Sequence, residues 1–114
     1  SRQPVAFSAE IARYVDANFT RPELYLKSVT EHFNLSEKAL QLAVRDATGM
    51  SFAEYLETRR LEMACRLLLQ TDLSVAEVAE QSGFALYNTF YKSFKRHFNC
   101  SPNEYRQSGP ESAR

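Results

Sequence analysis

The pattern of hydrophobic and polar positions is clearest between residues 74 and 105. Ser74 can act as the N-cap of a helix, because Glu77 follows three residues later and completes a capping box. Gly83 can then supply a left-handed turn at the end of this helix. The pattern therefore predicts a short helix followed by a tight turn.

A second helix is predicted to begin at about Leu86 and to present two different faces. One face is apolar, because phenylalanine recurs every four residues at Phe90, Phe94 and Phe98. The opposite face is polar, aromatic and basic, and it carries Tyr87, Asn88, Tyr91, Lys92 and Lys95. Two short helices that meet at a glycine turn are typical of the helix-turn-helix unit, whose second helix, the recognition helix, enters the major groove of DNA. The pattern therefore favours DNA binding.

The chain is predicted to begin with a helix that has a packing role. Ser8 can cap this helix, and Pro22 marks its end. Its apolar stripe is formed by Ile11, Val15 and Phe19. Residues 1–7 are interpreted as a linker or as the edge of the folded region.

A second copy of the helix-turn-helix pattern follows this first helix. The segment from Leu24 to Phe33 is amphipathic and is followed by Asn34, a residue type that tolerates a left-handed turn. Ser36 can cap the next helix. The inward face of that helix is predicted to hold Leu40, Ala43, Val44 and Ala47. Its outward face is predicted to hold Glu37, Lys38, Gln41, Leu42 and Arg45.

The two copies are related by an offset of 50 residues from the recognition helix onward and by an offset of 49 before it, which pairs Asn34 with Gly83. Adding 50 to each outward position of the first recognition helix gives positions 87, 88, 91, 92 and 95 of the second. The cap that follows each recognition helix is also repeated, as Ser51, Glu54 and Tyr55 and then as Ser101, Glu104 and Tyr105. An internal repeat of this length is stronger evidence than a single motif. Residues 51–70 contain neither glycine nor proline and predict one long helix that links the two units.

Composition narrows the class of function. A chain of 114 residues with 44% hydrophobic content suits one domain or two very small ones, and no apolar run is long enough to span a membrane. The formal net charge is zero, which is unusual for a nucleic-acid binder, but residues 86–114 are predominantly basic while residues 71–85 contain no cation. Cys65 and Cys100 have no neighbours at zinc-ligand spacing, so we expect free thiols, no metal and no cofactor.

Several separated motifs occur in a distinctive order: Arg60-Leu61-x-x-Ala64-x-x-Leu67-Leu68, Val78-Ala79-x-x-x-Gly83-Phe84, Phe90-x-x-x-Phe94-Lys95 and Ser101-Pro102-x-x-Tyr105-Arg106. Together they resemble the DNA-binding domain of the AraC/XylS family of bacterial transcription regulators, over a stretch from about Glu10 to Arg106. The resemblance implies an all-α fold of about seven helices, with two helix-turn-helix units joined by a long central helix. We therefore expect a first unit over residues 8–50, a linking helix over residues 51–70, a second unit over residues 71–108 and a flexible tail over residues 109–114.

The resemblance also implies which outward positions read bases, namely Lys38, Gln41, Leu42, Tyr87, Asn88, Tyr91 and Lys92. Gln41 and Asn88 are suited to an adenine edge, and the two lysines to guanine acceptors. Leu42 departs from the family pattern, where arginine is frequent, and Val44 replaces a frequent aromatic residue. We therefore expect the second unit to contribute more of the sequence specificity than the first.

Members of this family usually carry a separate ligand-sensing or dimerising domain. The chain is therefore expected to be either the C-terminal domain of a longer regulator or a short stand-alone member. The expected partner is double-stranded DNA, with RNA polymerase as a further candidate, and we expect a monomeric isolated domain in the cytoplasm with no membrane contact.

Two other classes of protein share features with this sequence. A related domain occurs in DNA alkyl-transfer enzymes, but that chemistry needs a zinc-bound cysteine cluster, and this chain has two cysteines, so we expect no enzymatic activity. The alternative is a helical protein-interaction module without DNA binding, which the zero net charge favours.

Overall fold

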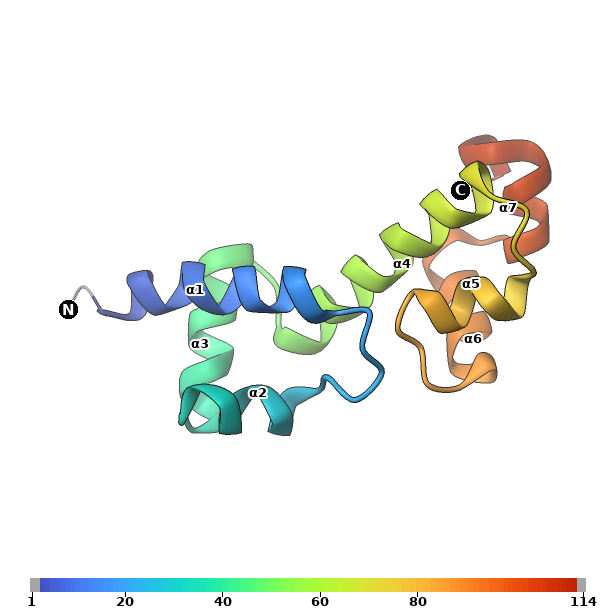
Figure 1. Cartoon of the computed structure of the whole chain (residues 1–114). Coiled ribbons are helices and arrows are strands. Elements are labelled where there is room, and N and C mark those ends of the chain that lie inside the picture. The colour runs from blue at the N-terminus through green and yellow to red at the C-terminus, as the bar shows by residue number, and fades with distance from the viewer. Residues whose placement is uncertain (1–2, 113–114) are drawn as a thin grey trace. The chain divides into compact units, whose positions relative to one another are not determined.

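The computed structural model describes residues 3–112 and the side chains of residues 7–111. Within this range every regular element is a helix, so the expected all-α fold with seven α-helices is confirmed. Figure 1 shows the elements in chain order from blue to red. They are α1 (Gln3–Asn18), α2 (Leu26–Phe33), α3 (Glu37–Thr48), α4 (Phe52–Gln70), α5 (Val75–Gln81), α6 (Tyr87–Phe98), α7 (Pro102–Ser108) and a 3-10 helix, η1 (Gly109–Ser112).

The chain forms two compact units, which divide within α4 between Arg59 and Arg60. In the first unit α1 packs across α3, and α2 packs against α3 after a short turn. The buried apolar side chains of this unit are Ile11, Val15, Phe19, Leu24, Val29, Leu40, Ala43, Val44, Phe52 and Leu56. Ala47, which was predicted to face inward, is exposed, because the buried stripe of α3 ends at Val44.

Helix α1 begins earlier than the sequence pattern predicted. It starts at Gln3, so Ser8 lies inside the helix and is buried instead of acting as its N-cap. Pro4 is compatible with this start, because proline is tolerated in the first turn of a helix, where its missing N–H would have no intrahelical partner. Residues 3–7 are therefore helical and do not form a linker, and residues 1 and 2 lie outside the described part of the chain.

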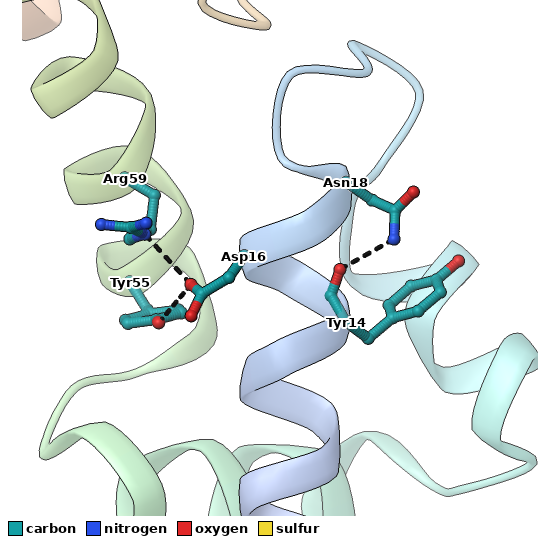
Figure 2. Close-up of polar contacts among 5 residues, drawn as sticks. All are labelled: Tyr14, Asp16, Asn18, Tyr55 and Arg59. Carbon is teal, nitrogen blue, oxygen red and sulfur yellow. Dashed lines mark hydrogen bonds and ion pairs between the residues drawn. The ribbon is translucent and has the colours of Figure 1, made fainter.

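Polar contacts join α1 to the first half of α4 within the first unit (Figure 2). The hydroxyl group of Tyr55 donates a hydrogen bond to Asp16 Oδ1 at 2.5 Å, and Arg59 Nε donates to the same oxygen at 3.0 Å. The Arg59 guanidinium also lies over the ring of Phe19, 5.3 Å from its centroid. These contacts hold the first half of α4 against α1.

Left-handed turn residues and serine caps occur in both units. Asn34, Gly49, Gly83 and Asn99 all have positive φ, as predicted for the residues that end or follow the helices. The hydroxyl groups of Ser36, Ser51, Ser74 and Ser101 accept hydrogen bonds from the backbone N–H three residues later. The linking helix α4 therefore begins directly after its cap at Ser51 and runs for 19 residues to Gln70.

In the second unit α6 packs against α5 and α7 over a single core cluster. Its fully buried phenylalanines are Phe90 and Phe94, whereas Phe98 is only partly buried at the edge of the cluster. Arg106 donates from its guanidinium to the carbonyl oxygens of Leu68 at 3.0 Å and Thr71 at 3.2 Å. This side chain ties α7 to the C-terminal end of α4, where helix carbonyls lack intrahelical partners.

Candidate nucleic-acid interface

Helix α6 presents the whole predicted polar face to solvent. Tyr87 is 45% exposed and Tyr91 is 37% exposed, and their rings lie 6.2 Å apart between centroids. The remaining predicted residues of this face, which are Asn88, Lys92 and Lys95, are also exposed. The opposite face packs through Phe90 and Phe94 into the core, so the rotation of α6 about its own axis is fixed by the phenylalanine stripe.

Charge on α6 has a single sign. The helix contains no acidic residue, and its last turn carries Lys95, Arg96 and His97. Lys92 lies one turn earlier on the exposed side. Lysine and arginine on an exposed helix face are suited to DNA phosphates, which carry the sequence-independent part of binding.

The start of α6 differs from the start of every other capped helix in the second unit. Leu86 is its N-cap residue and makes no side-chain cap hydrogen bond. The leucine side chain is 66% exposed, next to Tyr87 on the same end of the helix. Sequence reasoning took Leu86 only as the start of the helix. The signal that would have singled it out is an apolar residue at a position where serine or threonine is preferred.

Helix α3 presents a chemically different face. Glu37, Lys38 and Arg45 are exposed, and Leu42 is 61% exposed. Asp46 is exposed as well, so two acidic and two basic residues lie on the exposed side of this helix. The face of α3 is therefore close to neutral and includes an apolar group, in contrast to the cationic face of α6.

Gln41 is the exception among the predicted residues of α3. It is only half-exposed, and its Oε1 atom accepts a hydrogen bond from the backbone N–H of Phe52 at 2.9 Å. Phe52 is the first residue of α4. Gln41 therefore contacts the linking helix in addition to lying on the outward side of α3.

Each unit thus brings its predicted residues together on one face of one helix. Glu37, Lys38, Leu42 and Arg45 share the exposed side of α3, and the five predicted residues of α6 share the exposed side of that helix. A helix face of this kind can offer hydrogen-bond donors and acceptors, apolar contact and cations to the edges and phosphates of a duplex.

The two cysteines do not add a reactive site. Both are free thiols, and Cys100 is buried while Cys65 is half-buried. Burial raises the pKa of both thiols, which disfavours the reactive thiolate. Burial likewise raises the pKa of Tyr105, which lies in the same core cluster, to about 12. In the described part of the chain no group of three or more histidine, cysteine, aspartate or glutamate residues could hold a metal ion.

Among residues 3–112 no helix has the length and apolar character needed to cross a membrane.

Comparison with known proteins places the chain in a well-defined group. Residues 29–108 match the family described as the helix-turn-helix domain. The probable transcription factor PqrA of Proteus vulgaris is 30% identical over 101 residues, which are 88% of this chain and 83% of PqrA. The transcriptional activator RhaS of Salmonella schwarzengrund is 35% identical over 98 residues, but these span only 35% of its length.

Solved structures of similar fold include domains of regulators. The C-terminal domain of AraT, a response regulator from Geobacillus stearothermophilus, superimposes with a TM-score of 0.84 and 34% identity, covering 89% of this chain and 84% of that domain. The DNA-binding domain of the transcriptional factor AdpA, solved in complex with a target DNA, has a TM-score of 0.81 and 27% identity. The match covers 89% of this chain and 90% of that one.

Proposed function

The chain belongs to the AraC/XylS family of helix-turn-helix transcription regulators, and we propose that it binds specific sites on double-stranded DNA through α3 and α6. The relatives are transcription regulators, and one structural neighbour was solved with its target DNA. Sequence-specific DNA binding is therefore the function of this domain. The assignment of individual residues to that function is our proposal.

The observation that carries the assignment is the division of α6 into two faces. A buried phenylalanine stripe fixes the helix in the core, so its polar face points outward without further support. Asn88 is suited to the N6 and N7 atoms of adenine, and Lys92 to the O6 and N7 atoms of guanine. Lys95 lies in the last turn and is suited to a phosphate.

Helix α3 is proposed as the second recognition helix, with a smaller share of the specificity. Its exposed leucine, Leu42, offers only apolar contact, such as contact with a thymine methyl group. Lys38 and Arg45 can reach guanine or phosphate groups, and Glu37 can accept from the N4 atom of cytosine. The mixed charge of this face lowers its attraction to phosphates relative to α6.

Both recognition helices are proposed to act on one asymmetric site. The linking helix α4 runs unbroken for 19 residues, which is about 28 Å at 1.5 Å per residue and close to the roughly 34 Å between successive major-groove segments. Because the outward residues of the two units differ, the two contacted segments are expected to differ in sequence and to lie about 10 base pairs apart. We propose that the DNA bends toward the protein if the spacing is shorter than this repeat.

The wider context of the domain is also a proposal. The chain spans about a third of the length of RhaS, which is consistent with a C-terminal domain in a longer regulator that carries a separate sensing domain. We propose that the isolated domain is a monomer in the cytoplasm, that it has no catalytic activity, and that RNA polymerase is a further partner.

The proposal is tested by selecting sites for this domain from random duplexes and measuring affinity at two salt concentrations. Asn88→Ala and Lys92→Ala should each reduce discrimination by about 1–3 kcal/mol, whereas Lys95→Ala should weaken binding to all sequences alike. Affinity should fall log-linearly with salt. A protein-interaction module would bind no duplex at either salt concentration. An unchanged sequence preference in Asn88→Ala would show that this residue does not read a base.

A further inference from the structure

The side chain of Gln41 is engaged within the protein. Its Oε1 atom accepts from the backbone N–H of Phe52 at 2.9 Å, across 11 residues of chain. Because a backbone N–H can only donate, the side-chain atom that faces it is the oxygen. The first N–H groups of a helix have no intrahelical partner, and Gln41 satisfies one of them at the start of α4.

The Ser51 cap does not provide this contact. Its hydroxyl group accepts from the N–H of Glu54, and Glu54 Oε1 accepts from the N–H of Ser51 in return. The N–H of Phe52 lies between these two and is satisfied by α3 instead of by its own helix. The contact therefore joins the recognition helix of the first unit to the linking helix.

The sequence repeat shows that this contact belongs to the first unit alone. Fifty residues further on, Gln41 corresponds to Tyr91 and Phe52 corresponds to Pro102. Pro102 is the first residue of α7 and has no N–H to donate. The amide oxygen of Gln41 and the N–H of Phe52 are thus present in the first unit, and neither has a counterpart in the second. Tyr91 therefore makes no equivalent contact with the start of α7.

We propose that Gln41 is a positioning residue that fixes α3 against the start of α4, and that it does not select adenine. The second part rests on the proposed DNA-binding function. A glutamine selects adenine by using its oxygen and its nitrogen together. The Phe52 amide occupies one of the two lone pairs of Oε1 and fixes the orientation of the side-chain amide, so pairing with adenine through both atoms would require the glutamine to turn away from Phe52. The Nε2 donor remains uncommitted, and acceptors for such a donor occur on adenine, guanine and thymine.

The positioning role has a consequence for the whole face of α3. Lys38, Leu42 and Arg45 project from the same helix, so a small rotation of α3 moves all three together. Loss of the Gln41 contact is therefore expected to lower affinity and to weaken the base preference across all the positions that α3 contacts, and not at one position alone.

The test uses three variants of the chain. Gln41→Leu removes both the oxygen and the nitrogen, whereas Gln41→Glu keeps an oxygen that can accept from Phe52. Lys38→Leu is the control, because it adds the same side chain to the same helix without touching the Phe52 amide. Circular dichroism spectra first establish that each variant is folded.

The first measurement is amide hydrogen exchange of Phe52 by NMR in the DNA-free protein. We expect exchange about fivefold faster in Gln41→Leu, which corresponds to the loss of one ordinary hydrogen bond, and little change in Gln41→Glu or Lys38→Leu. Unchanged exchange in Gln41→Leu would overturn the positioning role. This measurement needs no DNA, so it decides that role even if the proposed DNA binding is wrong.

The second measurement is the base preference of Gln41→Leu on selected duplexes. We expect lower affinity, with the preference weakened to a similar extent at all positions under α3 and retained at the positions under α6. Loss of an adenine preference at one position, with other positions unaffected, would overturn the claim that Gln41 does not select adenine. Failure of the parent chain to bind any duplex would refute both the proposed function and this second part.

Discussion

Leucine at the start of α6 departs from the capping pattern of its neighbours. The N-caps of α3, α5 and α7 are serines, and each hydroxyl group accepts from the N–H three residues later at 3.1 Å. Leu86 holds the equivalent place with an extended backbone, at φ −126° and ψ 134°, but provides no such acceptor. We therefore predict that Leu86→Ser gains a cap hydrogen bond from the N–H of Thr89.

The stability gained from a serine cap at position 86 must be separated from the stability lost with the packing of the leucine. Leu86 is 66% exposed, so about a third of its side chain is buried, which is worth on the order of 0.5–1 kcal/mol. A serine cap is worth about 1 kcal/mol relative to alanine. The comparison with Leu86→Ala removes the packing loss from the difference, because both variants lose the leucine. Leu86→Ser is therefore expected to be about 1 kcal/mol more stable than Leu86→Ala.

Urea denaturation of the two variants measures this difference through their midpoints at equal slope. Equal midpoints would refute the reasoning, because they would mean that the backbone at position 86 does not rotate toward the serine-cap geometry. DNA binding adds an independent readout. We expect both variants to bind the selected site more weakly than the parent chain, since both remove the leucine from the exposed start of α6.

Three further predictions concern stability. Arg106→Ala should destabilise the chain by about 1–3 kcal/mol, since it removes hydrogen bonds to the carbonyl groups of Leu68 and Thr71, and an unchanged urea midpoint would contradict this. Ser82→Ala should be neutral or stabilising, because the buried Ser82 hydroxyl has no hydrogen-bond partner in the described structure, and a large loss measured by thermal unfolding would disprove it. Hydrogen bonding from the Ser101 backbone lowers the pKa of Glu104 in the folded chain. The stability that ionised Glu104 contributes is therefore present above the ordinary carboxyl pKa of about 4.3 and is lost as the pH falls through the lowered value. Melting curves between neutral and acidic pH should show less acid destabilisation in Glu104→Gln than in the parent chain. Equal acid sensitivity would show that this carboxylate does not contribute to the loss of stability at acidic pH.

The features predicted correctly from the sequence are those decided locally. A serine followed by glutamate three residues later specifies a capping box from four consecutive residues, and Ser74 and Ser101 both form one. Asn34 and Asn99 adopt positive φ for the same kind of local reason. The outward faces of α3 and α6 also follow from local periodicity, because the spacing of buried residues leaves only one side exposed.

The features that were missed depend on contacts between distant residues or on a broken local rule. Serine is a preferred N-cap residue, but Ser8 lies inside α1. The helix begins earlier because Pro4 is tolerated in its first turn and no glycine or proline follows before Ser8. The Gln41 contact with Phe52 joins two helices, and nothing in the periodicity of α3 marks it. Leu86 is not one of the residue types preferred at an N-cap, so the sequence pattern indicates only that a helix begins there.

Comparison of the two repeats separates residues that build the scaffold from residues that meet the partner. The serine cap and the capping glutamate that follow each recognition helix recur 50 residues apart, as Ser51 and Glu54 and as Ser101 and Glu104, because both units need the same backbone geometry there. Left-handed turn residues also occur in both units. The outward residues differ at all five positions, and the Gln41 and Phe52 pair is replaced by Tyr91 and Pro102. Because the scaffold is constant and the exposed chemistry changes, we expect the two units to prefer different sequences. The chain should therefore bind its site in one orientation only, with the cationic face of α6 over one segment and the mixed face of α3 over the other.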